Sequence, residues 1–172
     1  EYIQLFLGDE RYLIENKNEL IINAKPCYLD MQTNILNPRI LLLNLEVTKE
    51  IINSIILTNC NVIFSRKNID FELARLLSKN NITVFDNIKK DDIELISKAI
   101  YKSIIINGKF IKPENVSKIT EIKKIKFNKN LSNKNFNNNI LDDNDNDNNF
   151  ISLKGFENKH IISTIISCEK EK

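Results

Sequence analysis

The sequence predicts an α/β fold, and three patterns along the chain carry this prediction. Between residues 37 and 107, short continuous apolar runs alternate with segments whose apolar residues recur at helical spacing. The runs are apolar on both faces, as in the central strands of a covered parallel sheet, so βαβ units with right-handed crossovers are expected. From residue 118 onward, apolar and charged residues alternate instead. The expected architecture is a mixed sheet with flanking helices and an antiparallel hairpin layer.

The first expected elements are two strands and a helix. "LIINAKPCYLDM" predicts a strand that ends at the turn formed by Pro26. In "NPRILLLNLEV" a proline precedes a continuous apolar run bounded by asparagines, which is a strong strand pattern. "KEIINSIILTN" then predicts a helix, because four isoleucines recur at helical spacing and Asn59 can cap its C-terminus. These isoleucines are Ile51, Ile52, Ile55 and Ile56.

Two further strand and helix pairs are expected next. "NVIFS" and "ITVFDNI" predict strands, each followed by a helix, and "SIIIN" predicts the strand that closes the series. In the helix of "NIDFELARLLSKNN", Asp70 is placed to act as the N-cap. In "KKDDIELISKAI", two aspartates stand near the positive end of the helix dipole. The inward residues of these two helices are expected to be Leu73, Leu76, Leu77, Ile93, Ile96 and Ile100.

Three strands are expected after residue 118, in "KITEIKKIKF", "FISLKGF" and "HIISTIIS", with a turn around Gly155 between the last two. Between the first two lie residues 128–149, whose Asn- and Asp-rich composition is too polar to bury and predicts a disordered hairpin insertion. Residues 1–172 are interpreted as one domain with its own core. Because the chain starts at Glu1 without a Met or a signal segment, we expect it to be a fragment of a longer protein.

Charge and cysteine content argue against several classes of partner. The 25 basic and 23 acidic residues leave a net charge of +2, which gives no field that would hold nucleic acid or an anionic membrane. No apolar run approaches the roughly 20 residues of a membrane span. Cys27, Cys60 and Cys168 are odd in number and widely spaced, so neither a disulfide framework nor a zinc site is indicated. A reducing compartment is the simpler expectation.

The sequence also lacks the motifs of catalysis and cofactor binding. Its three glycines are far apart and form no phosphate-binding array. Asp143, Asp145 and Asp147 have the spacing of a calcium loop, but the glycine and the glutamate that such a loop needs are missing. The single histidine, His160, stands among strand residues and is interpreted as structural. This chain is therefore not expected to be an enzyme or to bind a metal or a cofactor.

One helix face suggests a binding role. Opposite the leucines of the helix that starts after Asp70, the sequence places an aromatic residue and an arginine among small residues. Such a face can dock extended or unfolded chains, since aromatic residues and arginine are enriched at binding hot spots. The alternative is an ordinary solvated surface with one stray phenylalanine. The substrate-binding candidates are Phe71, Ala74, Arg75, Ser78 and Lys79.

The segment "ELIINAKPCYLDMQTNILNPRILLLNLEV" resembles, without a gap, the opening of the apical domain of group II chaperonins. "KEIINSIILTNCNVIFSRKNID" and "NNITVFDNIKKDDIELISKAI" are similar to the elements that follow in that family, and "FISLKGF…ISTII" resembles its closing hairpin. The Asn-Pro-Arg-Ile stretch is most similar to the gamma subunit of CCT, the eukaryotic cytosolic chaperonin. The matching positions in the opening segment are Met31, Ile35, Asn37, Pro38, Arg39, Ile40, Leu42 and Leu43.

This resemblance implies the substrate-binding domain of an ATP-dependent cytosolic chaperonin subunit. Such a domain captures unfolded client proteins through the helix from Asp70 to Lys79, in a double ring of paralogous subunits. In this family ATP and Mg²⁺ bind in a separate equatorial domain, and hydrolysis there swings the apical domain and closes a lid. The domain itself then needs no cofactor, nucleic acid or membrane, and its location is the cytoplasm.

The chain departs from the family at several places. Members of the family carry a long helical protrusion, the lid, between the strand of "LNLEV" and the helix of "KEII", and here the two meet at Thr48 and Lys49. The lid is either lost or omitted, and omission is favoured because both flanks match the family up to the join. The closing Arg-Gly of the family is absent, and "IKPENVSKIT" replaces its usual Leu-Gly segment. These differences indicate a divergent member.

Two other functions stay open from the sequence. The apical fold also occurs as a regulatory docking module in large lipid kinases that phosphorylate phosphatidylinositol 3-phosphate at the 5 position. Those modules resemble this chain in an Asn-Pro-Lys-Ile-Leu-Leu-Leu stretch and in a strand similar to "VFDNIKK". The other possibility is a degenerate apical-like domain with a purely structural role.

Overall fold

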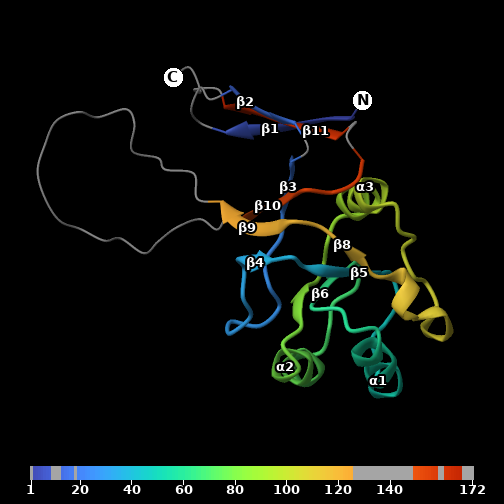
Figure 1. The fold of residues 1–172 in the computed structure, drawn as a ribbon. Coiled ribbons are helices and arrows are strands. Elements are labelled where there is room, and N and C mark those ends of the chain that lie inside the picture. The colour runs from blue at the N-terminus through green and yellow to red at the C-terminus, as the bar shows by residue number, and fades with distance from the viewer. Residues whose placement is uncertain (1, 9–12, 18, 126–148, 159–160, 168–172) are drawn as a thin grey trace, which may run out of the picture.

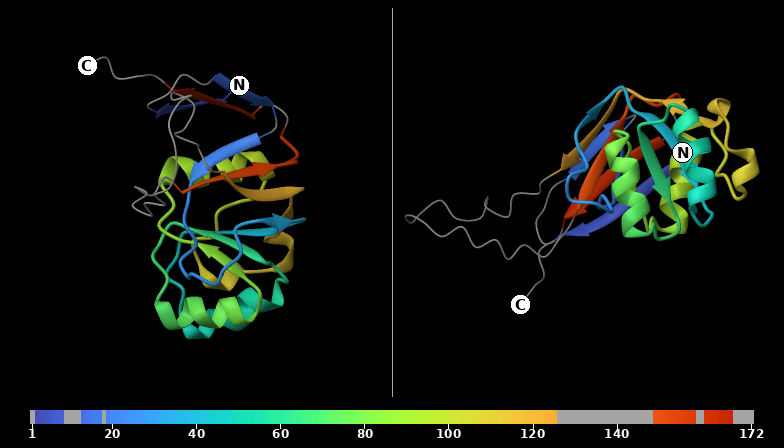
Figure 2. Two further views of the ribbon diagram at one scale, coloured as in Figure 1. Left: turned by 90° about the vertical axis from the view of Figure 1, so that its left-hand side faces the viewer. Right: turned by 90° about the horizontal axis from the view of Figure 1, so that it is seen from below.

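The computed structural model describes residues 2–8, 13–17, 19–125, 149–158 and 161–167. Within these residues the chain forms three β-sheets and three α-helices. Figure 1 shows the sheets stacked as layers, with the sheet of β1 at one end of the molecule and helices α1 and α2 at the other. The left view of Figure 2 shows the same order after a quarter turn. The predicted α/β class with a mixed sheet and flanking helices is confirmed.

The sheet nearest α1 and α2 is the βαβ part predicted from the apolar runs. Its strand order is β7-β6-β5-β8, with β5, β6 and β7 parallel and β8 antiparallel to β5. Four consecutive residues of β5, from Ile40 to Leu43, are buried, as a run that is apolar on both faces requires. The strands are β5 (Arg39–Leu43), β6 (Val62–Ser65), β7 (Thr83–Phe85) and β8 (Ser117–Lys118).

The three helices cover both faces of this sheet. Helix α1 (Lys49–Leu57) and helix α2 (Phe71–Lys79) share an apolar cluster with the side chains on one face. Helix α3 (Lys90–Ile100) packs in a second cluster, between the other face and the neighbouring sheet. Asn59 follows the C-cap of α1 in the left-handed conformation, with φ of 58°, which agrees with its predicted role in ending that helix.

The second sheet is the predicted antiparallel layer. Its order is β3-β10-β9-β4, and β10 pairs antiparallel with both β3 and β9. The hairpin of β9 and β10, which flanks the predicted insertion, is therefore confirmed. The strands are β3 (Glu19–Asn23), β4 (Ile35–Leu36), β9 (Glu121–Ile125) and β10 (Phe150–Lys154).

Strand β10 is more deeply buried than its alternating pattern predicted. Ser152 was expected on a half-exposed strand, but it is 2% exposed and its hydroxyl donates to the carboxylate of Glu19. Lys154 Nζ lies 3.3 Å from the same carboxylate, so this buried acid has two partners. Hydrogen bonding of this kind allows polar residues to lie on a buried strand. The sequence pattern alone does not distinguish a buried, hydrogen-bonded polar residue from a solvent-exposed one.

The third sheet contains β1 (Tyr2–Gly8), β11 (Ile161–Ser167) and β2 (Leu13–Lys17), in the order β1-β11-β2. Strand β11 therefore pairs with β1 and β2, and the expected hairpin between β10 and β11 is wrong. After Gly155, whose φ is 74°, the side chain of Phe156 enters the core and Asn158 N donates to Ala99 O of α3. These contacts hold the segment after β10 against α3, so the chain leaves β10 before β11 begins.

The segment after α3 also differs from the prediction. "SIIIN" was expected as a full strand, but only Ile105 forms a bridge, to Leu43. Tyr101 ends α3 in the left-handed conformation, and Ile106 is 73% exposed, so the segment leaves the sheet after one pair. Two short 3₁₀ helices, η1 (Gly108–Phe110) and η2 (Pro113–Asn115), lead to β8.

Several predictions are not tested by the fold. Thr48 is the N-cap residue of α1, directly before Lys49, and the omission of a lid at this join stays a prediction. The insertion at 128–149 lies outside the described residues except for Asn149, and so do His160, Cys168 and the three aspartates of the calcium-like spacing. In the described part of the chain, no helix has the length and apolarity to cross a membrane. Within the same residues, no three potential metal ligands gather in one place.

Candidate substrate-binding surface

Helix α2, which carries the candidate residues, has the ends that the sequence predicted. Asp70 is its N-cap, and its Oδ1 accepts a hydrogen bond of 2.9 Å from Glu72 N. At the other end Asn80 Nδ2 donates to Leu76 O at 2.9 Å, and Asn81 follows with φ of 57°. The helix is thus fixed at both ends on the outer face of the β7-β6-β5-β8 sheet.

The inward face of α2 differs from the prediction in two residues. Ala74, a predicted contact residue, is 1% exposed and belongs to the same apolar cluster as Leu73 and Leu77. Leu76, predicted to face inward, is 41% exposed. On a helix with about 100° per residue, Ala74 lies beside Leu77 and Phe71, while Leu76 falls on the far side of the outward face. The small Ala74 side chain therefore packs into the core and cannot contact a substrate.

The other four candidates keep access to solvent. Phe71, Arg75 and Lys79 are exposed, and Ser78 is half-buried. Their spacing of four residues places Phe71, Arg75 and Lys79 along one stripe of the helix. Neither Arg75 nor Lys79 forms an ion pair or a side-chain hydrogen bond with any described residue. Arg39 and Arg66, by contrast, donate to the backbone carbonyls of Asn59 and Ile88.

A turn that the sequence analysis did not single out lies beside α2. The segment 27–32 is fastened to strand β7 by hydrogen bonds along its length. Cys27 N donates to Val84 O at 2.9 Å, Val84 N donates to Met31 Sδ at 3.1 Å, and Thr83 Oγ1 donates to Gln32 O at 3.1 Å. Met31 is buried in the cluster beneath α2. The turn is therefore a fixed part of the surface.

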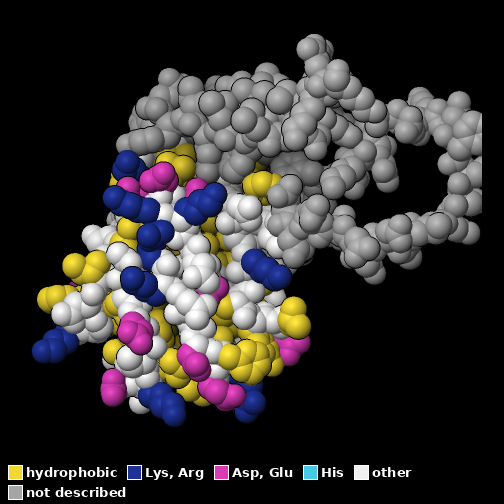
Figure 3. Space-filling model, turned by 180° about the vertical axis from the view of Figure 1, so that it is seen from behind, with side chains coloured by type: hydrophobic (Ala, Val, Ile, Leu, Met, Phe, Trp, Pro, Cys, Tyr) yellow, Lys and Arg dark blue, Asp and Glu magenta, His cyan; other side chains and the backbone are white. Residues whose placement is uncertain are grey.

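This fixed turn presents apolar side chains to solvent next to α2. The ring of Tyr28 contacts that of Phe71, with centroids 5.4 Å apart and planes tilted by 56°. Leu29, at the tip, is 93% exposed, and Phe71 is 59% exposed. Figure 3 shows hydrophobic side chains gathered, among charged ones, over the end of the molecule that carries α1 and α2. We call Tyr28, Leu29, Phe71, Arg75 and Lys79 the loop-helix surface.

A small polar pocket continues the loop-helix surface toward the C-terminal end of α2. Its volume is about 140 Å³, and it lies between the turn, the end of α2 and the start of β7. Ser78, one of the predicted contact residues, lines this pocket rather than the outward face of the helix. The polar residues that line it are Asp30, Gln32, Asn61, Ser78, Asn81 and Thr83.

The one thiol next to the surface has no features of a catalytic nucleophile. Burial and, to a smaller extent, the negative charge of Asp86 raise the pKa of the Cys27 thiol to about 12. A thiol with such a pKa is protonated at neutral pH. The loop-helix surface combines exposed apolar side chains with the charges of Arg75 and Lys79.

The comparisons with known proteins fit this fold. The chain superimposes on a solved structure described as the open-state monomer of a group II chaperonin from Methanococcoides burtonii, with a TM-score of 0.77 and 19% identity. The match covers 98% of this chain and 39% of that one, and it shows that the chain has the fold of a group II chaperonin segment. No family model matches the sequence.

Curated relatives point to the same group of proteins. The chain is 28% identical over 111 residues to thermosome subunit beta of Methanothermobacter thermautotrophicus, covering 60% of this chain and 21% of the relative. It is 30% identical over 122 residues to a thermosome subunit of Methanothermococcus thermolithotrophicus, covering 65% and 22%. The chain therefore spans about a fifth of the length of the curated relatives it matches.

Proposed function

We propose that this chain is the client-binding, apical-type domain of a chaperonin subunit. In this role it holds non-native polypeptides at the loop-helix surface while other parts of the parent protein supply the energy. The similarity to thermosome subunits and the group II chaperonin fold support a chaperonin-related role. The capture of clients is our inference from the surface itself.

The observation that carries the proposal is the exposure of apolar side chains on a rigid support. Leu29 is 93% exposed on a turn that is hydrogen-bonded to β7, so its side chain contributes almost nothing to the stability of the domain. Together with Phe71 and Tyr28 it can cover apolar residues that a non-native chain exposes. The unpaired Arg75 and Lys79 add charged contacts along the same helix. Because the site is already ordered, binding costs little conformational entropy on the domain side.

The proposed parent is an ATP-dependent chaperonin of the cytosol, similar to the CCT gamma subunit in its Asn-Pro-Arg-Ile stretch. It would bind ATP and Mg²⁺ in a separate equatorial domain and assemble with paralogous subunits in a double ring. Hydrolysis there would move this domain and its bound client, without nucleic acid or a membrane as partner. Mass spectrometry of the natural protein across the join of Thr48 and Lys49 tests whether a lid precedes α1.

The proposal is tested with the double variant Phe71→Asp with Arg75→Glu. The probe is reduced, carboxymethylated α-lactalbumin, which stays unfolded, and its binding to the purified chain is followed by fluorescence anisotropy. We expect binding at least about tenfold weaker, since aromatic and arginine residues dominate binding energies. The thermal midpoint should change little, because both side chains are on the surface.

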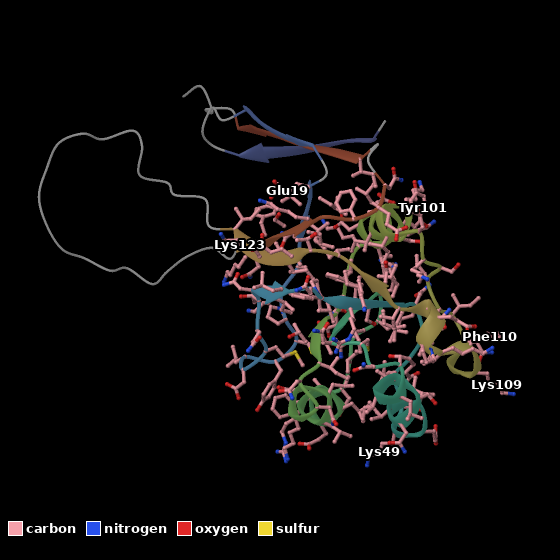
Figure 4. All side chains as sticks on the ribbon, viewed as in Figure 1. Glu19, Lys49, Tyr101, Lys109, Phe110 and Lys123 are labelled. Carbon is pink, nitrogen blue, oxygen red and sulfur yellow. The ribbon has the colours of Figure 1, made fainter. Side chains whose placement is uncertain are left out.

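The matched control is Phe110→Asp with Lys109→Glu. Phe110 is 64% exposed, beside a lysine on η1, so the pair offers the same chemistry away from α2. Figure 4 shows Lys109 and Phe110 on the side of the molecule where η1 projects, apart from α2. We expect the control to bind the unfolded probe like the natural chain. Equal binding by both double variants would refute the assignment of the site.

The similarities reported above are to chaperonin subunits, and none of them favours the lipid-kinase docking module. That alternative is therefore not proposed.

A further inference from the structure

We propose that the polar pocket at the C-terminal end of α2 receives a lysine or arginine side chain of the bound client. This inference rests on the proposed function and gives it a substrate class. The clients bound most tightly would carry a basic residue a short distance from a large apolar one. The apolar residue would lie against Tyr28, Leu29 and Phe71, and the basic residue would enter the pocket.

The fixed charges around the pocket favour a cation. Asp30 is the only charged residue among those that line it. The pocket also adjoins the C-terminal end of α2, where Ser78 and Asn81 contribute to its wall. The carbonyl end of a helix carries a partial negative charge, which adds to the attraction of the carboxylate. The positive side chains of Arg75 and Lys79 lie along the outward stripe of α2 and do not line the pocket.

The pocket has the size and the hydrogen-bonding groups for such a side chain. Its volume of about 140 Å³ exceeds that of several water molecules, at about 30 Å³ each, so it can hold an ammonium or a guanidinium group. Gln32 and Ser78 carry acceptor oxygens for N–H donors. The Oδ1 of Asn61 already accepts from Arg39 N at 2.6 Å, so it is not counted among them.

The pocket is formed before a ligand arrives. The hydrogen bond from Thr83 Oγ1 to Gln32 O ties one wall to β7, and the buried Met31 anchors the same wall from below. The opposite wall is the end of α2, where Asn81 N donates to Ser78 O at 2.9 Å. A preformed pocket needs little reordering on binding.

The geometry also sets the spacing of the two client residues. Phe71 and Ser78 are seven positions apart on one helix, which corresponds to about 10 Å along its axis. An extended chain covers about 3.3 Å per residue, so the basic residue should stand about three residues from the apolar one. This spacing does not fix whether the basic residue precedes or follows the apolar one in the client, so both orders belong in the test.

The experiment uses short fluorescent peptides that share one Phe-Leu pair and differ at the position about three residues away, on either side. Lys, Ser and Glu are compared there by fluorescence anisotropy with the purified chain at low salt. We expect the Lys peptide to bind roughly tenfold more tightly than the Ser peptide, as for a charge-assisted hydrogen bond, and the Glu peptide to bind least. The preference should decrease as salt is added, because Asp30 is exposed.

Two variants of the pocket test the assignment. Asp30→Asn keeps the shape and removes the charge, so the Lys peptide should lose its advantage over the Ser peptide. Ser78→Leu fills the pocket and should have the same effect while Asp30 is intact. Glu72→Gln is the matched control, since Glu72 is an exposed carboxylate on α2 that does not line the pocket. In this control the preference for Lys should be kept.

The outcomes separate the two proposals. Loss of the Lys preference in Asp30→Asn and Ser78→Leu, but not in Glu72→Gln, supports the pocket. Equal loss in Asp30→Asn and Glu72→Gln means a diffuse surface field and overturns it. Binding of all peptides alike, with sensitivity to Phe71→Asp, also overturns the pocket but leaves the client-binding function in place. If neither the peptides nor unfolded α-lactalbumin bind, the proposed function fails and the pocket assignment with it.

Discussion

The two faces of the β7-β6-β5-β8 sheet have different tasks. On one face, Phe64 and Phe85 stack with centroids 5.1 Å apart, in a cluster that includes α3 and the antiparallel sheet. On the other face, Ile63 and Val84 pack under α1, α2 and Met31. Adjacent residues of the same strand thus belong to separate cores. One core joins the layers of the domain. The other holds α1, α2 and the turn of the loop-helix surface against the sheet, together with Ile105 and Ile111.

This difference predicts that stability and the proposed client binding can be changed separately. Damage to the layer between the sheets should unfold the whole chain, because both sheets and α3 depend on it. Damage to the core beneath α2 should first free the turn and the helix.

The largest effect is expected from Phe64→Ala. Phe64 is fully buried and stacks on Phe85, so truncation leaves a cavity in the core that joins the layers. We expect a loss of about 3–5 kcal/mol in the free energy of unfolding, measured by urea denaturation. The transition should stay cooperative if the layers unfold together. A loss below about 1 kcal/mol would show that α3 and the sheets are held by other contacts.

A smaller and more local effect is expected from Met31→Ala. Met31 is 7% exposed and accepts a hydrogen bond from Val84 N, so the variant should lose about 2 kcal/mol and loosen the turn. Hydrogen exchange should become faster at the amides of Cys27 and Val84, while the amides of Leu42 and Phe64 stay protected. Client binding should weaken even where the chain is still folded. An equal increase in exchange rate at all four amides would contradict the separation of the two cores.

The smallest effect concerns the Cys27 thiol, at the start of the turn. Its pKa is raised from 9.0 to about 12 in the folded chain, chiefly by burial. The unfolded thiol therefore loses its proton first as the pH rises above about 9, so the unfolded state binds fewer protons and stability falls between about pH 9 and 12. The effect should stay below about 1 kcal/mol at pH 10, since the thiol is only partly buried and solvent screens it.

The measurement compares the natural chain with Cys27→Ala by urea denaturation from pH 8 to pH 10.5. Other groups titrate in both proteins, so the difference between their slopes isolates Cys27. As the pH rises, the natural chain should lose stability more steeply than Cys27→Ala. Parallel slopes would mean that the thiol ionises in the folded chain as readily as in the unfolded one.

The sequence predicted best where a residue's burial is decided by its own segment. Strands β5, β6 and β7 consist mainly of consecutive apolar residues, so no choice of face had to be made, and all three are found. Asp70 was identified as a cap because capping is a contact with its own helix. The α/β class and the antiparallel pairing of β9 with β10 follow from the same local patterns.

The predictions failed where a residue far away in the sequence determines the burial of a side chain or the pairing of a strand. Leu76 is more apolar than Ala74, so hydrophobicity placed Leu76 inside, but the sheet below α2 leaves room for the small Ala74 side chain. Ser152 is buried on β10 and donates its hydroxyl to Glu19, which lies on β3 opposite Lys154 and is far away in the sequence. The pairing of β11 with β1 likewise depends on the other end of the described fold. No local pattern reports such contacts.

The proposed binding surface was predicted in part for the same reason. Phe71, Arg75 and Lys79 come from one helix, and helical periodicity placed them on its exposed side, whereas Ser78 lines the pocket and Ala74 is buried. Tyr28 and Leu29 come from a turn that the chain brings to α2 through contacts with β7. A tyrosine and a leucine next to a turn-forming proline were the only signal in the sequence, and such a signal also fits an ordinary buried loop.

The parallel pairing of β1 with β11 gives the domain a mechanical property. Their register runs from Tyr2 opposite Ile161 to Gly8 opposite Ser167, so the start of one strand and the end of the other lie at opposite ends of the ladder. A force that pulls on these two points loads the ladder in shear, and its hydrogen bonds must break together instead of one after another. The β1-β11 ladder should therefore resist separation of the two strands under tension. A force applied to these strands is then transmitted to the rest of the domain.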